Sequence, residues 1–256
     1  MTEKLQFCSI QRADRLLIVT LERPEVLNSL HTPACEELDR IWAGYADDED
    51  LWVAILTGRG KAFCAGHDLG DSPHEPMPPG GFGGLTERSL DKPVIAAVNG
   101  MAYGGGMEMV LACDIVVAEE QASFGLTEPR VGAVALAGGV QRLCRRMPHA
   151  IAMGMLLTGR RISANEAHGW GLVNEVVATG EALAGARKWA EDIMSCAPLA
   201  VRMSKRLAIS SVEGPSFVQQ IVTDRDRNVD QLFASEDLQE GIAAFTQKRK
   251  PAWKGR

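Results

Sequence analysis

A single glutamate, Glu108, lies in an apolar segment directly after three glycines, in the stretch AYGGGMEMVLAC at residues 102–113. Glycines let a ligand approach the backbone closely. A helix that begins near Gly105 would add N–H groups without intrahelical partners and a partial positive charge. Glu108 would then lie one turn later on roughly the same face, so the segment can offer an N–H donor and a carboxylate to one polarised carbonyl oxygen or anion. The alternative is a glutamate that only favours the first turn of a helix.

A second glutamate, Glu128, lies in ASFGLTEPRVG at residues 122–132, after an apolar strand and before a proline. Two carboxylates in one apolar pocket repel each other and lose hydration, so their pKa values separate. One can then act as a base while the other stays protonated as an acid. The alternative for Glu128 is a loop carboxylate that faces solvent, and the residues alone leave open whether it meets Glu108.

The third stretch, GRGKAFCAGHDL at residues 58–69, follows a strand and has small residues around Gly66. This composition suits a turn whose backbone is exposed to a ligand. His67 and Asp68 suggest a metal site, but the five histidines form no pair with ligand spacing. We therefore expect a backbone role for this turn and no metal. G-x-G-x-x-G, P-loop and G-x-S-x-G motifs do not occur.

The elements that must position these residues follow an α/β pattern. The residues at 32–48 predict a helix, because their large apolar side chains recur at helical spacing. Continuous apolar runs separated by helices indicate a sheet covered on both faces. The predicted strands are residues 16–22, 52–58, 91–100 and 114–120. Residues 70–84, rich in Pro and Gly, predict a long loop, which is often functional.

From residue 181 onward the pattern becomes helical. Four helices are predicted, at residues 181–197, 198–210, 215–234 and 235–250. The last places Leu238, Ile242 and Phe245 on one face and is stopped by Pro251. An α/β body of about 180–195 residues therefore precedes a helical tail.

Composition limits the classes of partner. The chain has 256 residues and a net charge of −6, which argues against nonspecific binding to nucleic acid or to an anionic membrane. Its six scattered cysteines form no Cys-x-x-Cys pair, a pattern typical of buried thiols in a reducing compartment. The N-terminus has no signal-peptide pattern, and no apolar run reaches membrane-spanning length. We expect a cytoplasmic protein.

Together, the stretches FCAGHDL, NGMAYGGGMEMVLACDI and FGLTEPRVG resemble the enoyl-CoA hydratase/isomerase (crotonase) family. LERPEVLNSL, LTGRRISANEAHGWGLVNEVV and KRKPAWKG extend the resemblance over nearly the whole chain. It implies a right-handed spiral of β-β-α units in residues 1–195, for acyl-CoA binding and catalysis. It also implies a C-terminal helical region in residues 196–256, for oligomerisation and active-site cover, in a homotrimer or a dimer of trimers.

The resemblance implies a role for each motif. The family holds the thioester carbonyl of an acyl-CoA with two backbone N–H groups, which by motif position belong to His67 and Gly105. In hydratases two glutamates flank the attacking water, and these match Glu108 and Glu128. The presence of both favours hydration. Coenzyme A is part of the substrate, so no separate cofactor is expected.

Coenzyme A itself is expected along LERPEVLN and the FCAG turn, where the main chain of Ala65 matches the position that touches adenine. Relatives often have a basic residue near position 25, where this chain has Glu25. Arg23 and the tail at 248–250 can replace that charge, unless the tail only favours a helix C-terminus. The expected contacts are Arg23, Val26, Leu27, Ala65, Gly66, Asp68, Leu69 and Lys248.

The acyl group is less defined by sequence. GGFGGLTE and FGLTEPRVG are similar to a branch that includes carnitinyl-CoA dehydratase. Aromatic residues make up 5% of the chain, and no cage for a trimethylammonium group stands out among them. The leading hypothesis is therefore hydration of a 2-enoyl-CoA. The alternatives are a carnitinyl-CoA dehydratase activity, a Δ3-Δ2-enoyl-CoA isomerase and a CoA-binding protein without turnover.

Overall fold

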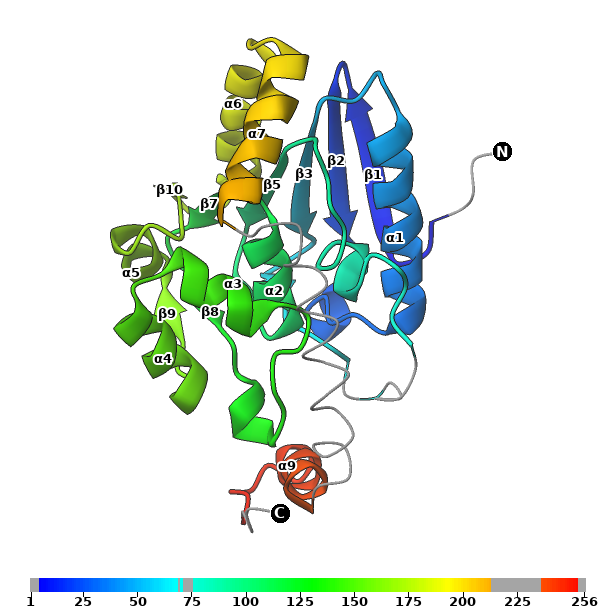
Figure 1. Cartoon of the computed structure of the whole chain (residues 1–256). Coiled ribbons are helices and arrows are strands. Elements are labelled where there is room, and N and C mark those ends of the chain that lie inside the picture. Colours follow the sequence, from blue (N-terminus) through cyan, green and yellow to red (C-terminus); the bar gives the residue numbers. More distant parts are fainter. Residues whose placement is uncertain (1–4, 69, 71–75, 213–235, 253–256) are drawn as a thin grey trace.

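Two β-sheets organise the computed structural model, which describes residues 5–68, 70, 76–212 and 236–252 (Figure 1). The larger sheet has six strands in the order β1-β2-β3-β5-β7-β10, parallel except for the hairpin of β1 and β2. The smaller has the order β4-β6-β8-β9, with only the β8–β9 pair antiparallel. The bounds of the larger sheet are β1 Cys8–Ala13, β2 Leu16–Leu21, β3 Val53–Gly58, β5 Val94–Val98, β7 Ile115–Glu119 and β10 Glu175–Val177. Those of the smaller are β4 Ala62–Cys64, β6 Met101–Tyr103, β8 Ser123–Gly125 and β9 Ile162–Ser163.

Helices cover both faces of the larger sheet. Alternate residues of β2 and β3 point to opposite faces, so Leu17 and Val19 join one core with α1 (Thr32–Asp47), while Leu16 and Ile18 join a second core with α6 (Ala182–Met194). Three alanines of α6, at positions 182, 186 and 190, are buried in that second core and keep the helix close to the strands. Burial on both faces explains why the strands are continuous apolar runs.

A repeated unit links the two sheets. Strands β3, β5 and β7 are each followed within a few residues by the short strands β4, β6 and β8 of the second sheet. Helix α2 (Gly105–Ala112) follows β6, and η3 (Glu128–Val131) and α3 (Gly139–Arg146) follow β8. The expected spiral of β-β-α units is thus confirmed. Because β4, β6 and β8 are parallel neighbours, their carboxyl ends lie side by side, and so do the turns that follow them.

The remaining elements complete the periphery: η1 Pro24–Val26, η2 Phe82–Gly84, α4 His149–Thr158, α5 Ala164–Gly169, α7 Pro198–Val212 and α9 Glu236–Thr246. The helix expected at 215–234 lies outside the described residues. Helix α9 ends at Thr246 rather than at Pro251, and Lys248 has a left-handed φ of 53°. Leu238 is buried, but Phe245 on the predicted apolar face is 61% exposed.

The strand expected before Glu128 is β8. The sequence did not indicate strands β1 and β10 of the larger sheet or β4, β6 and β9 of the smaller one, which are too short or too polar to give a periodic signal. The four longer strands predicted from apolar runs are confirmed to within three residues at each end. None of the helices in the described part of the chain is long and apolar enough to cross a membrane.

Candidate active site

Glu108 lies in the first turn of α2, yet its side chain is bound to a different helix. It is 4% exposed, and its Oε1 accepts hydrogen bonds from the N–H groups of Ala137 (2.8 Å) and Gly139 (2.9 Å). Gly139 is the first residue of α3, so the carboxylate lies at the positive end of that helix. The alternative that Glu108 merely favours its own helix start is therefore wrong.

Glu128 opens η3, directly after the turn that follows β8. Its Oε1 lies 3.2 Å from the place that a Cβ would take on Gly104, beside the start of α2. Its Oε2 is buried and has no hydrogen-bond partner among the described residues. A solvent-facing role for Glu128 is therefore wrong. A buried oxygen without a partner is costly, so it marks a place for a proton, a water or a ligand.

The two carboxyl groups influence each other electrostatically. Burial raises the pKa of Glu108 to about 7, against the lowering effect of the N–H groups of Gly139 and Ala137 and of the charge of Arg142. Burial, and then the charge of Glu108, raise the pKa of Glu128 to about 8. Near neutral pH the pair can therefore hold one proton, which is the condition for one acid and one base.

The turn after β4 contacts the start of α2. Gly66 has a φ of +102°, and a Cβ there would lie 2.9 Å from the carbonyl oxygen of Tyr103 and 3.2 Å from the nitrogen of Gly105. On the other side of this turn, Leu30 N–H donates to Gly66 O and Asp68 N–H donates to Leu30 O. In this parallel pattern the N–H of His67 points away from Leu30.

Two of the three glycines are explained by close packing. A Cβ on Gly105 would overlap the ring of Phe82, and a Cβ on Gly106 would overlap the carbonyl of Cys64. Phe82, in η2, therefore forms a wall beside the first N–H of α2, and its ring centroid lies 6.3 Å from that of His67. Phe82 was not identifiable as a site residue from the sequence, where its only signal was its place in the Gly-rich loop.

Most of the residues predicted to bind coenzyme A lie in two neighbouring segments, the 23–28 loop and the 65–68 turn, whereas Lys248 lies elsewhere. Leu27 O accepts a hydrogen bond from Ala65 N–H at 3.0 Å, so the 23–28 loop and the 65–68 turn lie together. Arg23 donates to Ser29 O and to Asp68 at 3.0 Å, which ties the same two segments. Its guanidinium is thus already engaged by a carboxylate. Val26 is half-exposed on this loop, and Leu69 lies outside the described residues.

Lys248 belongs to neither of these segments. It follows α9, and α9 packs against η3, where a Cβ on Gly241 would overlap the carbonyl of Val131. Within the described residues, no hydrogen bond or ion pair joins Lys248 to the other predicted CoA contacts. As for a metal, the described residues contain no group of three His, Cys, Asp or Glu side chains that could hold one.

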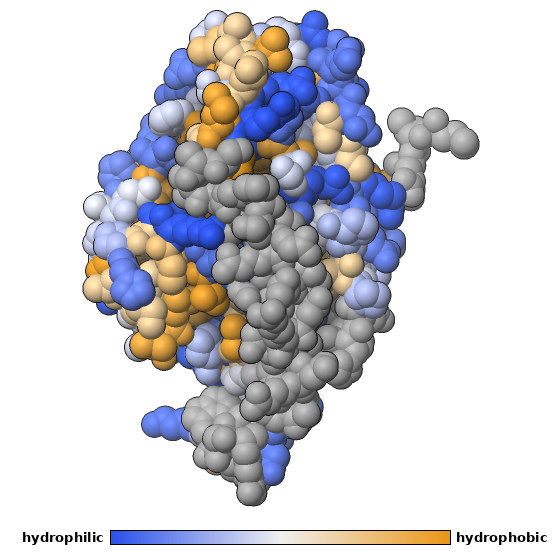
Figure 2. Space-filling model, viewed as in Figure 1, coloured by the Kyte–Doolittle hydropathy of each residue, from blue (hydrophilic) through white to orange (hydrophobic). Residues whose placement is uncertain are grey.

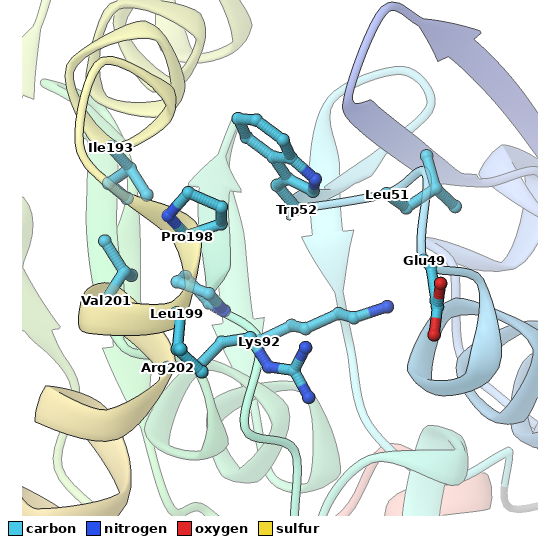
Figure 3. Close-up of a pocket in the computed structure, with 10 residues that line it drawn as sticks. Glu49, Leu51, Trp52, Lys92, Ile193, Pro198, Leu199, Val201 and Arg202 are labelled. Carbon is cyan, nitrogen blue, oxygen red and sulfur yellow. The ribbon is translucent and has the colours of Figure 1, made fainter.

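A separate pocket of about 250 Å³ lies near the start of β3, the end of α6 and the first turn of α7 (Figure 3). Its buried Lys92 donates to the carbonyls of Tyr45 and Asp48, and burial lowers its pKa. Neither glutamate of the pair lines this pocket, so it is distinct from the site described above. Its lining residues are Glu49, Leu51, Trp52, Lys92, Pro93, Ile193, Pro198, Leu199, Val201 and Arg202.

The site therefore combines backbone donors with paired acids. N–H groups near a carbonyl oxygen stabilise negative charge that develops there, and two carboxyl groups with pKa values near neutrality can take and give protons. Polarisation of a carbonyl beside proton transfer at a neighbouring carbon is the chemistry that this arrangement supports.

Comparison with known proteins agrees with this geometry. The sequence profile of the enoyl-CoA hydratase/isomerase family matches residues 11–256. Carnitinyl-CoA dehydratase of Escherichia coli (strain SMS-3-5 / SECEC) is 43% identical over 96% of this chain and 98% of its own. The crystal structure of carnitinyl-CoA hydratase from Mycobacterium avium superposes with a TM-score of 0.91 at 37% identity, covering 99% of this chain and 100% of that one. That of enoyl-CoA hydratase from Mycobacterium tuberculosis H37Rv gives 0.77 at 38% identity, covering 98% and 99%. The chain belongs to the enoyl-CoA hydratase/isomerase family.

Proposed function

We propose that this protein catalyses the reversible addition of water to the α,β double bond of a 2-enoyl-CoA, giving a 3-hydroxyacyl-CoA. The observation that carries the proposal is the interacting pair of Glu108, which is buried, and Glu128, which is partly buried, beside two backbone turns in close contact. In this reaction the N–H groups of His67 and Gly105 bind the thioester oxygen, on which negative charge develops as water attacks the β-carbon. One such donor is worth about 3 kcal/mol of transition-state stabilisation.

The two glutamates take up and supply the protons of this reaction. The ionised carboxylate takes a proton from the water as the new C–O bond forms, and the protonated one gives its proton to the α-carbon as the enolate collapses. The reverse sequence eliminates water. Coenzyme A enters as part of the substrate, and the 23–28 loop and the 65–68 turn are the proposed contacts for it.

For the acyl group we propose a chain that carries a trimethylammonium group, as in the substrate named for the relatives called carnitinyl-CoA dehydratase. The charges around the site favour a cation, because the acidic groups Glu87, Glu108 and Glu128 outnumber the one positive group that acts on Glu108, Arg142. The ring of Phe82 adds an aromatic surface near Gly105, and such surfaces attract quaternary ammonium groups. Both effects weaken for a neutral acyl chain.

The test compares three substrates by mass spectrometry of the products. These are crotonobetainyl-CoA, its neutral isostere 5,5-dimethylhex-2-enoyl-CoA, and a 3-enoyl-CoA. We expect addition of one water to the first, with kcat/KM at least about tenfold above the isostere, which corresponds to about 1.4 kcal/mol. Equal rates for the two would refute the preference for a cation, and double-bond migration without water would refute hydration. Glu108→Gln and Glu128→Gln should each abolish water addition.

We also propose a homotrimer or a dimer of trimers, in which residues 196–256 lie between subunits. Helix α7 exposes Leu199, Met203 and Leu207 at helical spacing, each more than half exposed, and Figure 2 shows apolar side chains over α7 and α4. Apolar faces of this kind mark protein–protein contacts. Light scattering on the purified protein should give three or six chains, and Leu207→Glu should lower that number. The free cysteines fit the reducing cytoplasm that we propose as its location.

A further inference from the structure

The charged side chain of Arg142 is buried between two loops of the site. Arg142 belongs to α3 and is 7% exposed. Its Nη1 donates to Ala137 O at 3.2 Å and its Nη2 donates to Thr86 O at 2.7 Å. Thr86 follows η2, the segment that carries Phe82, while the N–H of Ala137 binds Glu108. One guanidinium thus joins the loop beside Gly105 to the loop that holds Glu108.

We propose that Arg142 is a positioning residue: it fixes the loop at 137–139 and thereby determines which oxygen of Glu108 faces the substrate. The proposal rests on the proposed function, since it concerns the protonation state and aim of Glu108. Both N–H donors of this loop bind the same oxygen, Oε1, which leaves Oε2 for the reacting groups. A shift of the loop would release Oε1 and turn the carboxyl plane.

The charges around Glu108 give Arg142 a second effect. Two ionisable groups act on the charge of Glu108, Arg142 from α3 and Glu87 from the segment after η2, and Glu108 in turn acts on Glu128 in η3. Arg142 is the positive one, and it lowers the pKa of Glu108 against the effect of burial. Loss of its charge should therefore favour protonated Glu108.

The geometry and the charge can be separated by two substitutions. Arg has a planar fork of donors that can reach two carbonyls, whereas Lys has one compact ammonium. We expect Arg142→Met to lower kcat about 10- to 100-fold, since misplacement by about 1 Å can cost about 100-fold, and to move the acidic limb of the pH–rate profile up by about one unit. Arg142→Lys keeps the positive charge but cannot bind both carbonyls, so the acidic limb should return to its wild-type position while kcat stays low. KM for the acyl-CoA should change less than about threefold in both variants. Neither substitution removes a contact that binds the substrate equally in the ground state and the transition state.

Arg146 supplies a matched control. It lies one turn later in the same helix and donates to Cys113 O at 2.8 Å, so it also ties α3 to a backbone carbonyl. It has no bond to the 137–139 loop among the described residues. Arg146→Met should keep kcat and the acidic limb within about twofold and about 0.2 units, as expected for a purely structural tether.

A second readout does not need turnover. In protein labelled with 13C at glutamate carboxyls, the signal lost in Glu108→Gln identifies Glu108, and its titration midpoint should rise in Arg142→Met relative to wild type. A wild type without hydratase activity would refute the proposed function and leave this readout intact. Unchanged kcat, limb and midpoint in Arg142→Met, or equal losses in Arg146→Met, would overturn the role of Arg142. If Arg142→Met does not fold, a folded Arg142→Lys variant with wild-type kcat would equally overturn the role of Arg142.

Discussion

Gly139→Ala, which adds a single methyl group, should displace the carboxyl group of Glu108. Gly139 opens α3 without a left-handed φ, so alanine fits its backbone. The new Cβ, however, would lie 2.8 Å from Glu108 Oε1 and 3.0 Å from the Cβ of Ala135. Ordinary contacts of this kind lie near 3.5 Å. The carboxyl group must therefore move by about 0.7 Å.

This displacement has a calculable effect on ionisation. It stretches the 2.9 Å bond from Gly139 N–H to about 3.6 Å, which is no longer a hydrogen bond. A hydrogen bond to a charged group contributes about 1.5–3 kcal/mol, or about one to two pKa units. The pKa of Glu108 should rise from about 7 toward about 8–9. If ionised Glu108 is the base, less than about a tenth of it remains active at pH 7.

We therefore expect Gly139→Ala to lower kcat for hydration about 10- to 100-fold at pH 7, with partial recovery at higher pH. The assay is the pH–rate profile of kcat with saturating enoyl-CoA. Gly44→Ala is the control, because Gly44 lies in α1 with no atom within 4 Å of its added Cβ; it should keep full activity. An unshifted acidic limb and wild-type kcat in Gly139→Ala would refute the role of this N–H group.

Two further predictions follow from the same packing and charge. Gly105→Ala should lower kcat at least about tenfold, because its Cβ would overlap the ring of Phe82; Phe82→Leu in the same chain should restore part of the rate, and the absence of any recovery would contradict that clash. Glu128 has a folded-state pKa raised above its ordinary value of 4.5 to about 8, so the folded state binds the extra proton and stability falls as pH rises through this window. Glu128→Gln removes this loss of stability. The difference in Tm between the variant and wild type, measured by calorimetry, should therefore grow in favour of the variant by at least about 2 °C between pH 5 and pH 9. Parallel plots of Tm against pH for the two proteins would contradict a raised pKa.

The two glutamates were identifiable from sequence, but their meeting was not. Glu108 stood out as a lone acid in an apolar run, and Glu128 as an acid after a strand. Their proximity depends on the parallel register of β6 and β8, in which Ala102 pairs with Phe124. Local periodicity carries no information on register between segments twenty residues apart, so only the family resemblance linked them.

The groups that hold Glu108 had still less signal. Backbone N–H donors such as those of Ala137 and Gly139 carry no side-chain identity, and Arg142 lies in a helix rich in basic residues that suggests a surface. For Arg23 the sequence gives the charge of the side chain but not the anion that it binds. In the structure that anion is Asp68, because the 23–28 loop packs on the 65–68 turn.

The unequal surroundings of the two glutamates lead to an assignment of acid and base. Glu108 receives two N–H donors and faces Arg142, all of which favour its charged form, whereas Glu128 Oε2 has no partner among the described residues. The first proton lost by the pair should therefore leave Glu108, which makes Glu108 the base for water and Glu128 the acid for the α-carbon in hydration. By microscopic reversibility, Glu128 then removes the α-proton in the reverse direction. Exchange of the α-protons of a saturated acyl-CoA with deuterium oxide isolates that step, because no water is added or lost. We expect exchange to persist in Glu108→Gln and to be abolished in Glu128→Gln; the opposite pattern would reverse the assignment.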